Sequence, residues 1–210
     1  MIYLIGGSPR CGKTTIAKKL SEKLRISWIS SDTLESVASV YIAKKDMARL
    51  FPKGIMRKKT NLSNDKMYTT YTTKQICNAY IKQSKTIWKA IQMMVEVNKK
   101  EDHDVIIEGY HIHPQLIAKL QKLYPRSIKP VVLTRFDIDG IVEGCKKHKA
   151  KNDWFIQKTT DEKIYYRIAQ MIKCYSGFFQ KEAEKYKIAV VNVDGDFNKQ
   201  IQKAIKYLNN

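Results

Sequence analysis

Short apolar runs alternate with longer segments of helical periodicity along the whole chain. Apolar runs bounded by polar or turn residues are typical of buried strands, and they predict strands at residues 2–5, 26–29, 104–109, 130–133 and 188–193. Apolar residues spaced three and four apart predict helices at residues 13–24, 33–50, 74–99, 114–124, 160–186 and 197–208. Strands that alternate with helices indicate an α/β fold, with a parallel sheet covered by helices on both faces.

Residues 51–73 interrupt this pattern. They contain a proline, a glycine, the basic run at 57–59 and many threonines and asparagines, so we expect a loop-rich insertion there. No repeat, low-complexity linker or domain boundary is apparent in the sequence. We therefore expect residues 1–210 to form one domain, in which the insertion at about 51–73 contributes Arg57 to a substrate site.

The most specific motif lies between the first predicted strand and the first predicted helix. Residues 7–14 are Gly-Ser-Pro-Arg-Cys-Gly-Lys-Thr, a complete match to the phosphate loop in the strand–turn–helix context that this loop requires. Glycines let the backbone wrap around phosphates, and the loop amides and the helix N-terminus face their negative charge. We expect Lys13 to reach the β- and γ-phosphates of ATP and the Thr14 hydroxyl to hold Mg²⁺. The predicted nucleotide-binding residues are Gly7, Ser8, Pro9, Arg10, Cys11, Gly12, Lys13, Thr14 and Thr15.

Two acidic residues stand where predicted strands end. Asp32 follows the second strand and Glu108 ends the third, and ligands of α/β sheets bind at the carboxyl ends of strands. Asp32 could accept a proton from a substrate hydroxyl or bind Mg²⁺, and a helix N-cap is the alternative. Glu108 could orient the magnesium ion or act as the base instead of Asp32, and an exposed acid at a strand end is the alternative.

The turn after Glu108 contains further candidates for substrate contact. We expect Gly109 and His111 to face the substrate, and simple packing is the alternative for His111. His111 and His113 could suggest a metal pair. No third ligand is evident, however, and two histidines alone do not define a zinc site.

The region at about 137–155, after the fourth predicted strand, is highly charged, and it contains a basic cluster at residues 146–151. Kinases carry a lid at this position, and its lysines, Lys146, Lys147, Lys149 and Lys151, would stabilise the transferring phosphoryl group and exclude water. A solvated charged helix is the alternative. Arg135 and Arg167 are further candidates, because the planar guanidinium group binds phosphate through two donors at once.

The net charge, the absence of a long apolar run and the cysteines narrow the range of possible functions. The net charge of +19 favours a polyanionic partner, or it reflects a compositional bias, since the lysines are spread over the whole chain. No apolar run approaches the roughly 20 residues of a membrane span, so we expect no membrane partner. The four cysteines form no Cys-x-x-Cys pair, and we expect free thiols in the cytoplasm.

The loop at residues 4–15, together with Ile107-Glu108-Gly109-Tyr110-His111 and Pro114, resembles the P-loop kinases related to 2-phosphoglycerate kinase. More broadly, the chain resembles the adenylate-kinase-like small-molecule kinases. This resemblance implies a three-layer P-loop NTPase sandwich whose five-stranded parallel sheet has the order 2-3-1-4-5. It also implies a substrate-binding insertion of the NMP type and a lid.

We therefore predict an ATP-dependent phosphotransferase that uses Mg²⁺ and moves the γ-phosphoryl group of ATP to a hydroxyl or phosphate of a small molecule. A polynucleotide 5′-kinase or other RNA-acting enzyme, and a non-catalytic ATP-binding switch, remain alternatives, and nucleic acid is a less favoured partner. The expected assembly is a monomer or a homodimer. The predicted catalytic residues are Lys13, Asp32, Glu108, Arg135 and Arg167; the substrate residues are Asp32, Arg57, Glu108, Gly109 and His111; the metal-binding residues are Thr14, Asp32 and Glu108.

Overall fold

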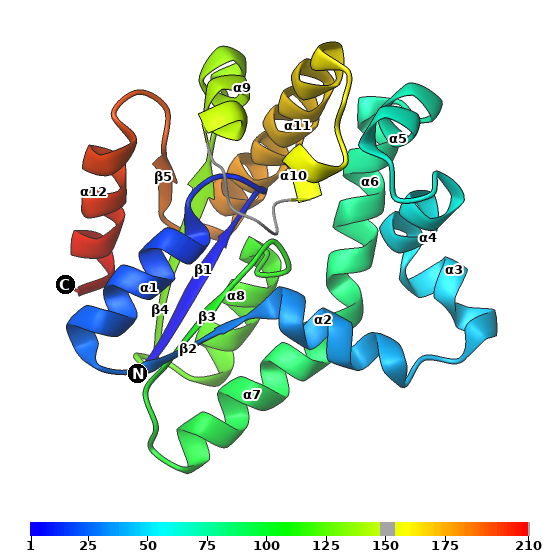
Figure 1. Ribbon diagram of the computed structural model, residues 1–210. Helices are drawn as coiled ribbons and strands as arrows, with labels where there is room; N and C mark the ends of the chain where they lie inside the picture. Colours follow the sequence, from blue (N-terminus) through cyan, green and yellow to red (C-terminus); the bar gives the residue numbers. More distant parts are fainter. Residues whose placement is uncertain (148–153, 210) are drawn as a thin grey trace.

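The computed structural model describes residues 1–147 and 154–209. In this part of the chain, five parallel strands form one sheet in the order β2-β3-β1-β4-β5 (Figure 1). Both the predicted fold class and the predicted strand order are confirmed. The strands are β1 (Ile2–Gly7), β2 (Ser27–Ser30), β3 (Val105–Glu108), β4 (Ile128–Thr134) and β5 (Val190–Asn192).

The strands run in one direction, so their carboxyl ends meet at one edge of the sheet. Ile5 of β1 and Ser30 of β2 both pair with Glu108 of β3. Gly7 of β1 pairs with Leu133 of β4. This register places the beginning of the phosphate loop, Glu108 and the residues after β2 beside one another, at the edge where α/β sheets bind ligands.

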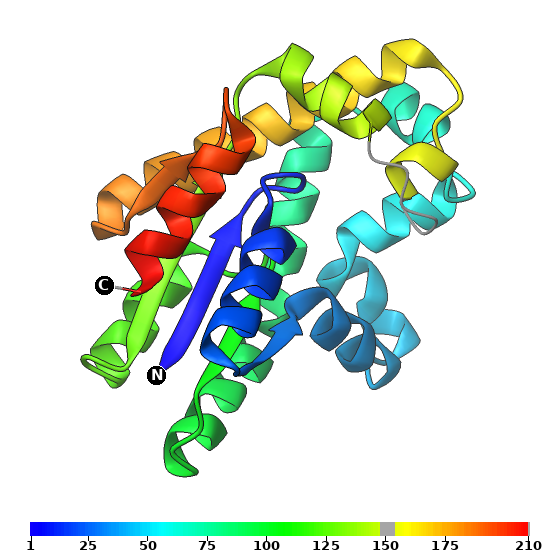
Figure 2. The ribbon, with the colours of Figure 1, turned by 60° about the vertical axis from the view of Figure 1, so that its left-hand side comes forward.

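Each face of the sheet has its own hydrophobic core, because successive side chains of a strand point to opposite faces. Tyr3 and Ile5 belong to one core, and Ile2 and Leu4 belong to the other. Figure 2 shows two helices in front of the first face, one from each end of the chain. The helices on the first face are α1 (Lys13–Leu24) and α12 (Phe197–Asn209); those on the second include α6 (Thr73–Ser84), α7 (Trp88–Lys100), α8 (Pro114–Leu123) and α11 (Glu162–Tyr186).

The segment predicted as a loop-rich insertion is largely helical, so this expectation is wrong. It contains α4 (Pro52–Lys59) and α5 (Asn64–Thr70). Pro52 lies in the first turn of α4, where a missing N–H is tolerated. The Ser63 hydroxyl caps α5 by accepting a hydrogen bond from Lys66 N at 3.2 Å. Residues that resembled loop signals in the sequence are therefore helix starts.

Two predicted helices are each divided in the structure. Residues 33–50 contain most of α2 (Ser31–Val40), a 3₁₀ turn at Lys44–Asp46 and α3 (Met47–Leu50). Residues 74–99 form α6 and α7, which a 3₁₀ turn at Lys85–Ile87 separates. Turns of this type are frequent connectors between helices, and they leave little trace in the spacing of apolar residues.

The chain between β4 and α11 contains α9 (Ile138–Lys147) and α10 (Trp154–Gln157). The predicted lid at about 137–155 is therefore described at its two ends, and Lys149 and Lys151 lie outside the described residues. Figure 1 shows α5, α9 and α10 near the end of the sheet toward which the strands run. Among the described residues, none of the helices combines the length and the apolar character that a membrane span requires.

Candidate active site

The phosphate loop is the turn at residues 7–12 between β1 and α1. Gly7, Arg10 and Gly12 have positive φ values of 135°, 65° and 84°. A Cβ on Gly7 would lie 2.3 Å from the carbonyl oxygen of Leu133, so glycine is needed for this close approach to β4. The loop leads directly into the N-terminus of α1, whose first backbone N–H groups favour anions.

Ser8 anchors the loop to the core. Its hydroxyl oxygen lies 2.7 Å from Ser176 Oγ on α11 and 3.0 Å from Cys11 Sγ. Ser176 Oγ also accepts a hydrogen bond from the backbone N–H of Arg135 at 3.0 Å. Burial raises the pKa of the Cys11 thiol, which is therefore a neutral group in the loop. These contacts hold the loop to both α11 and the end of β4.

Lys13, Thr14 and Glu108 meet at the carboxyl edge of the sheet. Lys13 Nζ donates to the Ser8 carbonyl oxygen at 2.7 Å, and Thr14 Oγ1 donates to Glu108 Oε1 at 3.1 Å. Glu108 is 3% exposed. Burial raises the pKa of its carboxyl, while the charge of Lys13 and the hydrogen bond from Thr14 oppose this increase. A lysine, a hydroxyl and a carboxylate in this arrangement are the groups that bind nucleotide phosphates and their Mg²⁺ in P-loop proteins.

Asp32 lies in the first turn of α2 with an accessible carboxylate. The N-cap of this helix is Ser30, whose hydroxyl accepts a hydrogen bond from Asp32 N at 3.3 Å. The Asp32 side chain is 66% exposed, and its Oδ1 atom lies 3.7 Å from His111 Nδ1. Its negative charge raises the pKa of Glu108, so the two predicted acids are close enough to interact.

A buried polar cluster lies next to Asp32. Glu35 Oε2 accepts hydrogen bonds from Tyr110 Oη at 2.8 Å and from Lys53 Nζ at 3.3 Å, and Glu35 Oε1 accepts one from Gln83 Nε2. Lys53 also donates to Tyr110 Oη at 2.6 Å. The network joins α2, α4, α6 and the turn after β3. We call it the Glu35 cluster, and its members are Glu35, Lys53, Gln83, Tyr110 and His111.

The surroundings favour the charged form of Glu35 but disfavour the charged form of Lys53. Burial raises the pKa of Glu35, but the ring nitrogen of His111 and the charge of Lys53 outweigh this effect and lower the pKa to about 2. Burial lowers the pKa of Lys53 by more than the neighbouring acids raise it. Hydrogen bonds and charge outweigh burial for Glu35, whereas burial dominates for the Lys53 ammonium, which also lies against the rings of Tyr80 and Tyr110.

His111 and His113 are both core residues. His111 Nδ1 lies 2.8 Å from Ser31 Oγ, and its Nε2 atom lies 3.3 Å from Glu35 Oε2. His113 Nε2 lies 2.9 Å from Tyr175 Oη. Burial lowers the pKa of both rings, and that of His113 falls to about 3, so both are neutral near pH 7. His111 therefore borders the site as a member of the Glu35 cluster.

Asp32, Glu35 and His111 each bring one potential ligand atom within 4.8 Å of the others, and they are metal-binding residue types. Their surroundings favour another role. The Glu35 oxygens already accept hydrogen bonds from Lys53 and Tyr110, and the Lys53 ammonium supplies the positive charge that a metal ion would bring. We therefore interpret the group as a scaffold that holds α2 against the turn after β3.

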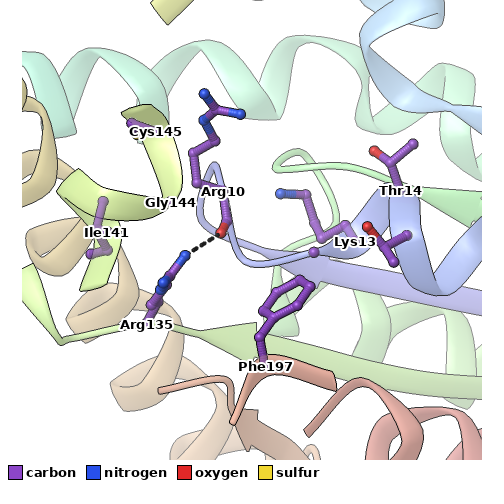
Figure 3. Close-up of a pocket in the computed structure, with 10 residues that line it drawn as sticks. Arg10, Lys13, Thr14, Arg135, Ile141, Gly144, Cys145 and Phe197 are labelled. Carbon is purple, nitrogen blue, oxygen red and sulfur yellow. Dashed lines mark hydrogen bonds between the residues drawn. The ribbon is translucent and has the colours of Figure 1, made fainter. Parts of the chain in front are cut away.

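A cavity of about 460 Å³ lies beside the phosphate loop, which is within the size range of small-molecule sites (Figure 3). Arg135 forms part of its wall, with Nη2 donating to the Gly140 carbonyl at 2.8 Å and Nη1 to the Arg10 carbonyl at 3.5 Å. Phe197, the first residue of α12, lies against the loop, since a Cβ on Gly12 would be 2.7 Å from its ring. The other lining residues include Lys13, Thr14, Thr15, Ile141, Gly144 and Cys145.

The other two predicted arginines come from different helices. Arg57 is on α4, and its charge acts on the buried Tyr80, as does the charge of Asp32. The structure thus brings Arg57 and Asp32 toward the same tyrosine. Arg167 is on α11, and its Nη1 atom donates to the Tyr68 carbonyl oxygen at 2.6 Å. This hydrogen bond joins α11 to α5.

Gly109 lets the turn after β3 pass close to α2. Its φ is 147°, and a Cβ at this position would lie 1.7 Å from Ser31 Oγ. A side chain would therefore push α2 away from β3. Gly109 thus lets the turn after β3 lie close to α2, which places Tyr110 and His111 within reach of Glu35.

Glu35, Lys53 and Phe197 are functional candidates that sequence reasoning missed. Glu35 follows Ser31 by one helical turn, so the helical period indicates that it points in the same direction. Its partners, however, come from separate elements that the sequence does not place. Phe197 opens a predicted helix, and its position beside the loop depends on how α12 packs against α1.

The sheet order, the phosphate loop between β1 and α1, and the acid at the end of β3 define the P-loop kinase fold.

No family model matches the chain. A 2-phosphoglycerate kinase from Methanopyrus kandleri is 25% identical over 199 residues, which cover 91% of this chain and 56% of that protein. An uncharacterised protein from Dictyostelium discoideum is 24% identical over 130 residues, which cover 60% of this chain and 14% of that protein. The chain thus spans little more than half of the first relative and a small part of the second.

Solved structures include chains of similar fold. Shikimate kinase from Bacteroides thetaiotaomicron superposes with a TM-score of 0.50 at 14% identity, over 100% of this chain and 96% of that chain. A gluconokinase from Sinorhizobium meliloti 1021 has a TM-score of 0.48 at 11% identity, over 99% of this chain and 90% of that chain. The likeness to shikimate kinase shows the fold.

Proposed function

We propose that this protein is an ATP-dependent kinase that transfers the γ-phosphoryl group of ATP to a hydroxyl or phosphate of a small molecule, with Mg²⁺. The observation that carries the proposal is the hydrogen bond from Thr14, just after the phosphate loop, to Glu108. The exposed carboxylate of Asp32 lies close enough for its charge to act on Glu108. The P-loop kinase fold supports the proposal, and so does the similarity to a 2-phosphoglycerate kinase.

The residues around the loop fit a magnesium–nucleotide complex. Thr14 and Glu108 offer the oxygen donors that Mg²⁺ prefers, and Lys13 offers positive charge beside the loop. In the proposed complex Lys13 binds the β- and γ-phosphates, Thr14 and Glu108 hold the ion, and the base occupies the cavity next to Phe197. The bound ion would neutralise charge on the transferring group.

Asp32 is the proposed base or acceptor-orienting residue. Its exposed carboxylate can accept the proton of an acceptor hydroxyl, whereas the Glu108 carboxylate is buried and already accepts a hydrogen bond. The Glu35 cluster holds the helix that carries Asp32. Arg57 is proposed to bind the acceptor, and Arg135 to stabilise the transferring phosphoryl group.

The acceptor is tested by incubating the full chain with MgATP and a panel of candidate molecules. 2-Phosphoglycerate comes first because the Methanopyrus kandleri relative is named for it, followed by shikimate, gluconate, nucleosides and an RNA with a 5′-hydroxyl end. Mass spectrometry would follow one phosphoryl gain for each ADP formed. A preference for the RNA would favour a polynucleotide 5′-kinase, as the net charge of +19 suggests. ATP binding without any phosphorylated product would favour a switch module.

The Lys13→Ala variant tests the phosphate site itself. We expect turnover to fall by about 100-fold or more, because a charge-stabilising donor is lost from the site. Lys18→Ala is the matched control, since Lys18 is an exposed lysine of the same helix. Turnover in Lys13→Ala equal to that in the control would contradict the assignment.

The proposed location is the cytoplasm. All four cysteines are free thiols, and this state is typical of a reducing compartment.

A further inference from the structure

Asn64, the first residue of α5, is fully buried and joins three segments of the chain. Its Nδ2 atom donates to Thr159 Oγ1 at 3.0 Å, and its Oδ1 atom accepts from Arg57 Nη1 at 3.4 Å. Its backbone N–H donates to the Lys158 carbonyl oxygen at 2.8 Å. One buried amide thus connects the proposed acceptor-binding arginine with the segment that follows α10.

The next residue strengthens this connection. The Asp65 carboxylate accepts hydrogen bonds from Thr160 Oγ1 at 2.6 Å, from Thr160 N at 3.0 Å and from Asp161 N at 3.3 Å. These hydrogen bonds outweigh burial and lower the pKa of Asp65. The start of α5 and residues 158–161 are therefore held together by both side-chain and backbone contacts.

The same segment reaches the phosphate loop through α10. Thr159 Oγ1 donates to the Phe155 carbonyl oxygen, and the Phe155 ring lies 4.9 Å from the Arg10 guanidinium carbon. Arg10 lines the nucleotide cavity. A continuous chain of contacts, Arg10–Phe155–Thr159–Asn64–Arg57, thus runs from the nucleotide side of the site to the proposed acceptor side.

We propose that Asn64 is a positioning residue that couples nucleotide binding to the acceptor side by fixing Arg57 to the Thr159 segment. This inference rests on the proposed function of the site. A nucleotide that orders Arg10 and Phe155 also restricts Thr159 and Asn64, so less conformational entropy remains to be lost when Arg57 binds an acceptor. Nucleotide and acceptor are therefore expected to bind with positive coupling.

Hydrogen exchange tests this coupling without knowledge of the acceptor. The probe is the non-hydrolysable ATP analogue AMP-PNP with Mg²⁺, and amide exchange is followed in two regions, residues 8–15 and residues 52–70. In the wild-type chain we expect the analogue to slow exchange in both regions, by about fivefold or more in the second. In Thr159→Val, an isosteric change that removes the hydroxyl, the slowing at 8–15 should persist and that at 52–70 should weaken, since the contacts of Asp65 and of the Asn64 backbone remain.

Two further variants separate coupling from general loss of structure. Thr159→Ser keeps the hydroxyl and should restore the slowing at 52–70, and Asn64→Ala should weaken it as Thr159→Val does. Asn98→Ala is the matched control, because Asn98 is a partly buried amide on α7 that donates to the Met94 carbonyl oxygen. Should Asn64→Ala fail to fold in thermal melting, the Thr159→Val and Thr159→Ser pair decides alone.

The outcomes distinguish the inference from the function on which it rests. Undiminished slowing at 52–70 in folded Thr159→Val would overturn the coupling, and so would wild-type slowing that is confined to 8–15. An absence of slowing in both regions of the wild-type chain would contradict nucleotide binding, and it would also contradict the inference, which depends on that binding.

Discussion

Thr14 Oγ1 donates a hydrogen bond to Glu108 Oε1 at 3.1 Å, although the two residues are 94 positions apart in the chain. The contact follows from the strand register, because Ile5 of β1 pairs with Glu108 of β3 and the phosphate loop returns the chain to this edge at the start of α1. The proposed magnesium site depends on this relationship.

Replacement of Glu108 by glutamine tests that site. The amide oxygen can still accept the hydrogen bond from Thr14, so the change removes charge with little change of shape. We expect kcat to fall by about 100-fold, because charge near the transferring group is lost, and the KM for ATP to change little. Steady-state rates at several Mg²⁺ concentrations measure both constants. Glu96→Gln, at an exposed position of α7, is the control, and an equal kcat in the two variants would argue against the assigned role.

Phe197→Ala tests the proposed base site. The ring lies against Gly12 at the wall of the nucleotide cavity. Loss of base–aromatic stacking should raise the KM for ATP by about tenfold while kcat stays close to the wild-type value. Tyr207→Ala, at an exposed position of the same helix, should leave KM unchanged. An unchanged KM in Phe197→Ala would place the base elsewhere.

Gly109→Ala should destabilise the fold and not merely the site. The new Cβ would collide with Ser31 Oγ, and φ is 147°, so we expect a loss of about 2 to 4 kcal/mol in the free energy of unfolding. Gly177→Ala is the matched control. Gly177 lies in α11 with open space around it, and alanine there should stabilise the helix by about 0.5 to 1 kcal/mol. Denaturant unfolding of both variants measures these opposite effects, and a stable Gly109→Ala variant would show that α2 can move.

His113 should make the protein sensitive to mild acid. Burial lowers its pKa in the folded chain from 6.5 to about 3, so the unfolded chain binds a proton that the folded chain does not. The contribution of neutral His113 to the free energy of unfolding is complete above pH 6.5. It falls as the pH decreases toward about 3, by roughly 1.4 kcal/mol per pH unit for one such group. His111, whose pKa burial also lowers, acts in the same direction.

His113→Phe separates this effect from general acid unfolding. The hydroxyls beside the ring keep partners, since Ser84 donates to the Ile81 carbonyl and Tyr175 to the Tyr110 carbonyl. Urea unfolding between pH 6.5 and 5 should show a shallower pH dependence than in the wild-type chain, because one of two buried histidines is gone. His103→Gln, at an exposed position beside Glu101, is the surface control for the loss of a histidine. A wild-type slope in His113→Phe would assign the effect to other groups.

Local signals in the sequence predicted much of the fold. Buried parallel strands are short continuous apolar runs, and each predicted strand overlaps an observed one, because both faces of such a strand must be apolar. The helix at 13–24 was predicted with its observed bounds for a similar reason, since the glycine of the phosphate loop and the apolar period mark its limits. The insertion was predicted poorly, because Pro52 and Ser63 act as helix starts and not as loop residues.

The sequence by itself determined the phosphate loop and the two acids at strand ends, because each depends on a contiguous motif or on the end of one strand. The tertiary structure alone decided how these groups combine. Glu35, Lys53 and Tyr110 form one network because α2, α4 and the turn after β3 pack together. Asn64 meets Thr159 across 95 positions because α5 packs against α11 and the segment that precedes it. Hydrogen bonds between distant segments leave no periodic or local pattern, so folding in three dimensions creates them.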